Sequence, residues 1–250
     1  MLNDGGMNTL SAAIPLRPPS EADPEALLAE VIDSGWPQLI LPQALGGKGA
    51  DSLALAQALQ TLARRHPAAA WMAWSHGLVM EALVRSPNVA VRETVLPDLL
   101  DGSRAGAVSW VADFGLAPAP KPVRAEALER GWHLHGRLDQ VLNLQWVGYV
   151  VLCPVWFAAP TGVGPRLGWT LLRSEEDGLR HELDRSRPLT RQAACGSLQL
   201  QRVYFREDEL LADDADALSA PLSVLDQTLR SAVWSGVSGT SDLPVSALQP

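Results

Sequence analysis

The feature that most constrains the fold of this chain is a change in hydrophobic periodicity near Gly102. Before this residue, apolar side chains recur every three or four positions, as on one face of a helix, for example over Leu53–Arg65. After it, they alternate in short runs such as Trp132–Gly136, as in half-buried strands. Helices followed by strands predict two consecutive domains rather than a parallel sheet wrapped by helices.

We therefore expect an α+β fold, in which an N-terminal all-α helical domain is followed by a β-barrel or sandwich domain and one terminal helix. The predicted segments are a proline-containing arm over 1–20, a helical domain over 21–102, a β-domain over 103–215, and a remnant C-terminal helix with a tail over 216–250.

The expected helices begin near Glu21, with Pro24 in the first turn, and then cover Leu53–Arg65, Ala68–Arg85 and Val89–Leu100. The third of these is apolar on nearly every face, so we expect it to be buried all round. The expected strands and the last helix follow in order: Ala105–Val111, Trp132–Gly136, Val141–Cys153, Val155–Ala158, Leu167–Arg173, Ser197–Phe205, and the helix Leu222–Val237.

The charge balance narrows the choice of partners. The chain has 28 acidic and 20 basic residues and no local cluster of lysine and arginine, so nucleic acid and anionic membrane surfaces are poor partners. Its longest apolar run, Val147–Ala159, is interrupted by Pro154 and is shorter than the roughly 20 residues that span a bilayer. Cys153 and Cys195 stand alone, which favours buried thiols in a reducing, cytoplasmic location.

Several residues have both a functional and a structural interpretation. Gly46-Gly47-Lys48-Gly49 lacks the preceding strand and the Lys-Ser/Thr ending of a phosphate-binding loop, so a structural turn is favoured. His76 is either a base near an acyl pocket or a core histidine bonded to a backbone carbonyl. His133 and His135 share a strand face, but without a third ligand nearby we expect no metal site.

Trp71 and Trp74 lie three residues apart on the apolar helix, where a place in the core is favoured over a ligand cage. No Ser, His and Asp set shows a nucleophile-elbow pattern, so hydrolase chemistry has no support.

Three stretches, taken together, resemble the acyl-CoA dehydrogenase family. Their order and spacing agree with that family over about Glu21–Leu211. The matching landmarks are Gly35-Trp36 with Leu41-Pro42 and the glycine loop, Arg92-Glu93 with Leu96-Pro97 to Gly102, and Gly131-Trp132 to Gly136 with Gly178-Leu179 and Gly196-Ser197 to Phe205.

This resemblance implies a flavoprotein in which FAD lies between the β-domain and a C-terminal helical domain. A carboxylate base removes the α-proton of acyl-CoA or another acyl thioester, and the flavin accepts a hydride. The positions that align with the flavin-contacting segments of the family are Ser109, Trp110, Val111, Val141, Leu142 and Asn143.

The same alignment shows substitutions. Val111 and Leu142 stand where the family has threonines, and Gln140 stands where it has tryptophan. Replacing Val111 with Thr is expected to tighten flavin binding.

No residue matches the catalytic base, which the family carries in its C-terminal helical domain. Only the first helix of that domain is expected here, and its Asp216 and Asp226 are interpreted as solvated helix-end charges. Two hypotheses stay open: an oxidoreductase that depends on a partner, and a non-catalytic relative that binds an acyl thioester or a protein. In the family, the C-terminal helical domain covers one face of the β-domain. Large exposed apolar patches are rare on monomers, so we expect this face to be covered in a homodimer or in a complex with a full-length relative.

Overall fold

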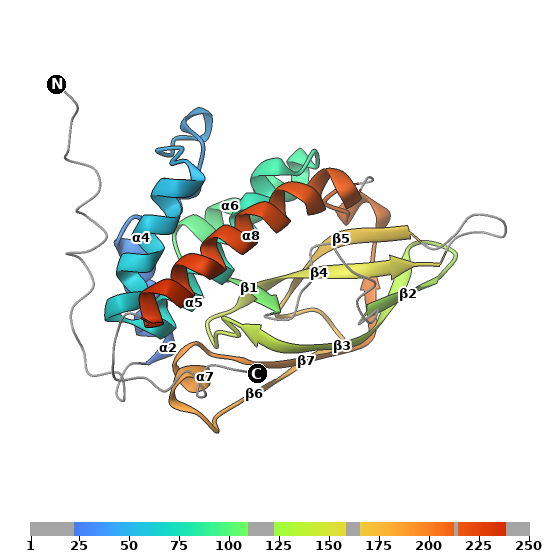
Figure 1. Cartoon of the computed structure of the whole chain (residues 1–250). Helices are drawn as coiled ribbons and strands as arrows, with labels where there is room; N and C mark the ends of the chain where they lie inside the picture. The colour runs from blue at the N-terminus through green and yellow to red at the C-terminus, as the bar shows by residue number, and fades with distance from the viewer. Residues whose placement is uncertain (1–22, 110–122, 159–165, 213–214, 239–250) are drawn as a thin grey trace.

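The computed structural model describes residues 23–109, 123–158, 166–212 and 215–238. Its longer helices gather on one side and its strands on the other, and the last helix, α8 (Ala215–Ser238), lies along α4 (Ser52–Arg65) and α5 (Pro67–Arg85) (Figure 1). The expected fold class is confirmed: a helical N-terminal region precedes a strand-rich part with a small barrel and a C-terminal helix. The helices are α2 (Pro24–Asp33), α3 (Trp36–Ile40), α4 (Ser52–Arg65), α5 (Pro67–Arg85), α6 (Val89–Leu100), α7 (Pro188–Gln192) and α8 (Ala215–Ser238), with the 3-10 turns η1 (Gln43–Leu45) and η2 (Glu207–Glu209).

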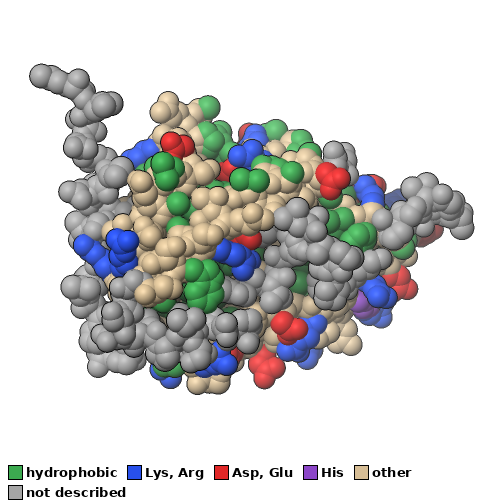
Figure 2. All heavy atoms as spheres, viewed as in Figure 1, with side chains coloured by type: hydrophobic (Ala, Val, Ile, Leu, Met, Phe, Trp, Pro, Cys, Tyr) green, Lys and Arg blue, Asp and Glu red, His purple; other side chains and the backbone are tan. Residues whose placement is uncertain are grey.

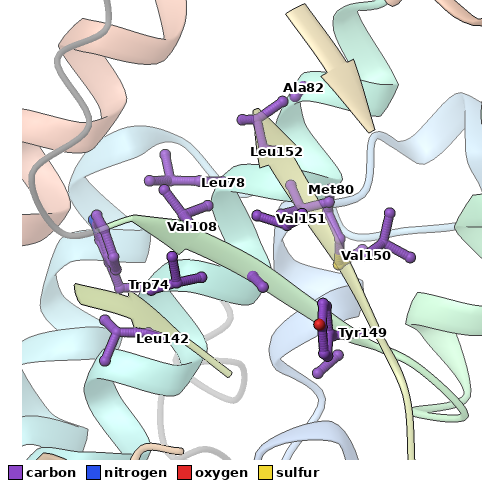
Figure 3. Packing of buried hydrophobic residues seen from close by; sticks show 14 of the residues in the cluster. Trp74, Leu78, Met80, Ala82, Val108, Leu142, Tyr149, Val150, Val151 and Leu152 are labelled. Carbon is purple, nitrogen blue, oxygen red and sulfur yellow. The ribbon is translucent and has the colours of Figure 1, made fainter. Parts of the chain in front are cut away.

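Helix α5 forms the centre of the molecule and is buried on nearly every face, as its composition predicts. It begins at Pro67, which is tolerated in the first helical turn, and His66 caps it by accepting from the N–H of Ala69. Figure 3 shows α5 side chains such as Leu78 against Val108 of β1. No helix of the described ranges is long and apolar enough to cross a membrane.

Seven strands form one sheet that partly closes on itself. Its order is β1-β4-β2-β3-β7-β6, β5 pairs with the outside of β4, and an additional β1–β3 pairing closes the small barrel. Strands β1 and β2 run parallel to β4, and the other pairs are antiparallel. The strands are β1 (Ala105–Ser109), β2 (Val123–Ala127), β3 (Trp132–Leu142), β4 (Tyr149–Phe157), β5 (Arg166–Arg173), β6 (Leu179–Leu183) and β7 (Gly196–Phe205).

The prediction of one strand over Val141–Cys153 is wrong. Strand β3 ends at Leu142 and β4 begins at Tyr149, because the chain turns through Asn143 at φ 64° and Gly148 at φ 131°. The separate strand predicted after Pro154 is part of β4. Proline is tolerated there because β4 pairs with β1 up to Leu152 and with β2 only from Trp156, so the missing N–H falls between the two pairings.

Other differences concern short or polar elements. Strand β2 was not predicted because its alternation is short and rests largely on alanine, and β6 was not predicted because its three central side chains, Arg180, His181 and Glu182, are all polar and exposed. Helix α8 begins at Ala215 instead of Leu222, because Pro221 lies inside the helix rather than before it. The predicted residues 21–22 of the first helix, 110–111 of the first strand and the loop 112–121 lie outside the described residues.

On the face shown in Figure 2, the described basic and acidic side chains are interspersed and form no single basic patch.

Candidate functional site

A cavity of about 660 Å³ lies where the end of β3, the segment from β6 to β7 and helix α5 meet. Its lining combines Trp71 and Leu142 with the amide of Gln140 and charged residues of the segment 182–187. Ligand pockets have volumes of roughly 300–1,000 Å³ and place a few polar groups in a mostly apolar wall. The cavity therefore has the size and composition of a small-molecule site.

The floor of this cavity is a β-bulge in β3. The pairing of β3 with β7 shifts register between Leu138 and Val141, and Gln140 inside the bulge has φ 51°. The hydroxyl of Ser109 donates to the backbone carbonyl of Asp139 over 2.6 Å and ties the bulge to β1. Because a bulge breaks the alternation of a strand, Arg137 and Asp139 line the cavity together with Gln140 and Leu142.

Asn143, which follows β3, fixes the end of this strand by hydrogen bonds to three neighbouring segments. Its side-chain amide donates to the carbonyls of Met72 on α5, over 2.9 Å, and of Gly106 on β1, over 3.0 Å. Its backbone N–H donates to the carbonyl of Ala193. One buried residue thus connects α5, β1 and the segment before β7.

The structure separates the six predicted cofactor-binding residues. Leu142 lines the cavity, whereas Ser109, Val141 and Asn143 are buried in the wall that supports it. Trp110 and Val111 lie outside the described residues. The sequence did not predict that Gln140, Trp71 and residues of the segment 182–197 line the cavity. For Gln140 alone there was a signal, because it directly precedes Val141 in the segment that aligns with a flavin-contacting motif.

The charged residues of the cavity are partly paired. Nε of Arg137 lies 2.6 Å from Oδ1 of Asp139. Hydrogen bonds from the side chain and the backbone N–H of Ser186 lower the pKa of Asp184. A carboxylate with a lowered pKa is a weak general base. Asp184 is therefore unsuited to removing a proton from a carbon acid.

His76 is a core histidine, and its interpretation as one satisfied by a backbone carbonyl is confirmed. Its Nδ1 accepts from the N–H of Gly106 over 3.0 Å, so its Nε2–H donates to the carbonyl of Leu99, also at 3.0 Å. Burial lowers the pKa of His76 to about 4, against the opposing effect of the bond to Leu99. The imidazole is neutral and joins α5 to β1 and α6.

Three further features of the described residues bear on the site. Within the described ranges, no three His, Cys, Asp or Glu side chains are grouped to hold a metal. At Gly47, an added Cβ would lie 1.9 Å from the carbonyl oxygen of Leu41, so this glycine serves a tight turn. Cys153 and Cys195 are free and buried, and burial raises their pKa values to about 12 and about 11.

Two expectations need correction. Trp71 and Trp74 are buried and pack edge to face at 5.7 Å, as core residues do, but Trp71 also lines the cavity. Asp216 is exposed as expected, whereas Asp226 is buried. Asp226 accepts from the indole N–H of Trp74 over 2.9 Å and pairs with Arg230 at 2.7 Å. Its position in the middle of α8, facing α5, explains why it is not solvated.

A helical region packs on a small β-barrel, and a cavity lies where the two meet. Residues 17–103 match the family model described as the acyl-CoA dehydrogenase N-terminal domain. The family model thus confirms the resemblance to the acyl-CoA dehydrogenase family over the N-terminal part, and for the middle part solved structures show a shared fold. A sequence comparison with curated proteins finds no match.

Solved structures share the fold at low sequence identity. PigA with FAD and proline superimposes with a TM-score of 0.70 and 13% identity, covering 96% of this chain and 67% of that one. The prolyl acyl carrier protein oxidase AnaB gives 0.66 and 17%, covering 88% and 58%. The steroid ACAD Tcur3481–Tcur3483 gives 0.64 and 24%, covering 94% and 60%. The chain thus spans about three-fifths of the length of these proteins.

Proposed function

We propose that this chain is an acyl-CoA dehydrogenase-like flavoprotein and that the cavity at the β3 bulge takes the isoalloxazine ring of FAD. The observation that carries the proposal is the position of the cavity: its floor is the β3 segment that aligns with a flavin-contacting motif of the family. Structures with the same fold include one described as containing FAD.

The residues present fit a flavin in size and in chemistry. The volume of about 660 Å³ is sufficient for a ring system of this kind. Gln140 lines the cavity and its buried Oε1 has no hydrogen-bond partner among the described residues, so a rotation of this carboxamide would offer a polar group that a ligand could satisfy. Trp71 and Leu142 offer apolar contact, and Arg185 offers positive charge for the phosphates.

When bound, FAD would supply hydride acceptance for the oxidation of an acyl thioester. The residues of the chain would bind and orient the ring and exclude water from it. Asp184 is a weak base and Asp139 is paired with Arg137, so we propose that a partner subunit supplies the carboxylate for α-proton removal. The partner would be a full-length relative, because a second copy of this chain carries no residue that matches the base either.

The direct experiment is reconstitution with FAD. After incubation and gel filtration, the protein is expected to keep its yellow flavin absorbance, and titration should quench flavin fluorescence to an end point of one FAD per chain. If the protein stays colourless and leaves flavin fluorescence unchanged, the non-catalytic hypothesis replaces this one. Titration with an acyl-CoA thioester then tests whether the acyl ligand alone is bound.

Replacing Leu142 with Thr is expected to tighten FAD binding while lowering stability. The new hydroxyl would sit in the cavity wall and could donate to the flavin; one such bond is worth about 0.5–1.5 kcal/mol, or roughly two- to tenfold in Kd. The unfolding free energy should fall by about 1–2 kcal/mol because buried apolar surface is lost. Fluorescence titration and urea unfolding measure the two effects. The exposed Leu128 provides the control Leu128→Thr, which should change neither.

A further inference from the structure

Gln140 combines four features that a residue of ordinary structural role does not need. It lies in a β-bulge, has a left-handed φ of 51°, lines the cavity, and has a buried amide oxygen without a hydrogen-bond partner in the described part of the chain. Each is unfavourable or neutral for folding. Left-handed backbone is disfavoured for residues other than glycine, asparagine and aspartate, and buried unpaired polar atoms are rare.

Such features persist where the surroundings enforce them, and they cluster at ligand sites. Here the enforcing contact is visible: the hydroxyl of Ser109 holds the carbonyl of Asp139, the residue before Gln140, over 2.6 Å. On the other side of the bulge, Val141 resumes pairing with β1 at Ser109 and with β7 at Gly196. The bulge is thus fixed at both ends, and Gln140 lies in the cavity lining, where a rotation of its carboxamide would turn the covered Oε1 toward a ligand.

We propose that the carboxamide of Gln140 recognises the pyrimidine edge of the flavin. This inference rests on the proposed function, since it names the edge of the flavin ring to which Gln140 would hydrogen-bond. The pyrimidine edge carries one N–H donor, at N3, between two carbonyl acceptors. A carboxamide offers one acceptor and one N–H₂ donor group side by side, so it can pair with N3–H and with an adjacent carbonyl.

The pairing would also remove the anomaly at Gln140. Its Oε1 would accept from N3–H, and the amide Nε2–H would donate to a flavin carbonyl. Leu142, two residues along the same strand and on the same cavity wall, would contact the ring by its apolar side chain. Ser109 would act as a positioning residue, because it touches the bulge and is not part of the cavity lining.

The test compares FAD with 3-methyl-FAD, in which a methyl group replaces the N3 hydrogen. Flavin Kd values are measured by fluorescence titration for the wild type, for Gln140→Leu, and for the control Gln201→Leu on the exposed face of β7. The wild type and the control should bind 3-methyl-FAD about tenfold more weakly than FAD. Gln140→Leu should bind FAD about tenfold more weakly than the wild type and should discriminate between the two flavins by less than about twofold.

Gln140→Gly provides a second, independent measurement. Glycine adopts a left-handed φ without a steric penalty, so this variant should unfold at a higher temperature than the wild type while losing the same flavin affinity as Gln140→Leu. A residue with a purely structural role would lose stability instead.

The outcomes separate this inference from the proposed function. If FAD binds tightly to the wild type and Gln140→Leu discriminates against 3-methyl-FAD as strongly as the wild type does, the pairing is wrong and the flavin cavity stands. If Gln140→Gly melts at a lower temperature with unchanged FAD affinity, Gln140 is structural and the inference is overturned. If the wild type binds neither flavin, the proposed function and this inference fall together.

Discussion

Lowering the pH from 7 to 4 is expected to remove about 3 kcal/mol of unfolding free energy through His76 alone. In the unfolded chain this imidazole binds a proton near its ordinary pKa of 6.5, whereas burial lowers the pKa of His76 in the folded protein to about 4. Between these values the unfolded state binds more protons. Stability is therefore complete above pH 6.5 and decreases as the pH falls toward 4.

Urea unfolding of the wild type and of His76→Asn, at several pH values from 7 to 4, isolates this contribution. An asparagine oxygen can still accept from the N–H of Gly106, so the variant should fold, with a lower stability at pH 7 because the bond to Leu99 is lost. Its stability should fall by about 3 kcal/mol less than that of the wild type over this pH range. His133→Asn, on half-buried β3, controls for the substitution itself. Parallel curves for the wild type and His76→Asn would show that His76 does not titrate in this way.

Replacing Asp226 with Ala is expected to lower the unfolding free energy by about 3 kcal/mol or more. The substitution leaves the guanidinium of Arg230, whose side chain is only 19% exposed, without its carboxylate partner at 2.7 Å. It also removes the acceptor of the Trp74 indole N–H, while Arg230 stays stacked over that ring at 4.5 Å. Two polar groups between α5 and α8 thus lose their contact with Asp226 at once.

A double substitution distinguishes the lost pairing from a general loss of packing. Asp226→Leu combined with Arg230→Met replaces both charges with apolar groups, so it should recover at least half of the stability that Asp226→Ala loses. Asp216→Ala, an exposed carboxylate at the start of the same helix, should cost less than about 1 kcal/mol. Chemical denaturation provides the measurement. Equal losses for Asp216→Ala and Asp226→Ala would contradict the role of the buried pair.

The helical half could be predicted closely from the sequence because its signals are local. Asp51 and Asn88 accept backbone N–H bonds at the starts of α4 and α6, and the apolar pattern of α5 encodes its burial. The strand half was predicted less completely. Strand β2 alternates Val123, Ala125 and Ala127 with charged residues, but it is only five residues long and two of its three apolar residues are alanines, which are poor strand formers, so this alternation was too weak to predict a strand.

The candidate site was only partly predictable for a related reason. A family motif located the strand that carries Leu142, but a motif does not show which of its residues face a cavity. The bulge reverses the simple alternation at Gln140, so a period-two pattern misplaces this side chain. The burial of Asp226 depends on α8 packing against α5, a contact between segments about 150 residues apart that no local pattern encodes.

The position of α5 has a consequence for how the cavity can respond to a ligand. Three residues within two turns of this helix connect it to the site. Trp71 lines the cavity, the carbonyl of Met72 accepts from the side chain of Asn143, and His76 accepts from the N–H of Gly106 on β1. A shift of α5 would break all three connections together, so this wall should stay rigid. If the cavity adapts to ligands of different shape, we expect the movement in the segment 182–190, which lines the cavity and is largely exposed to solvent.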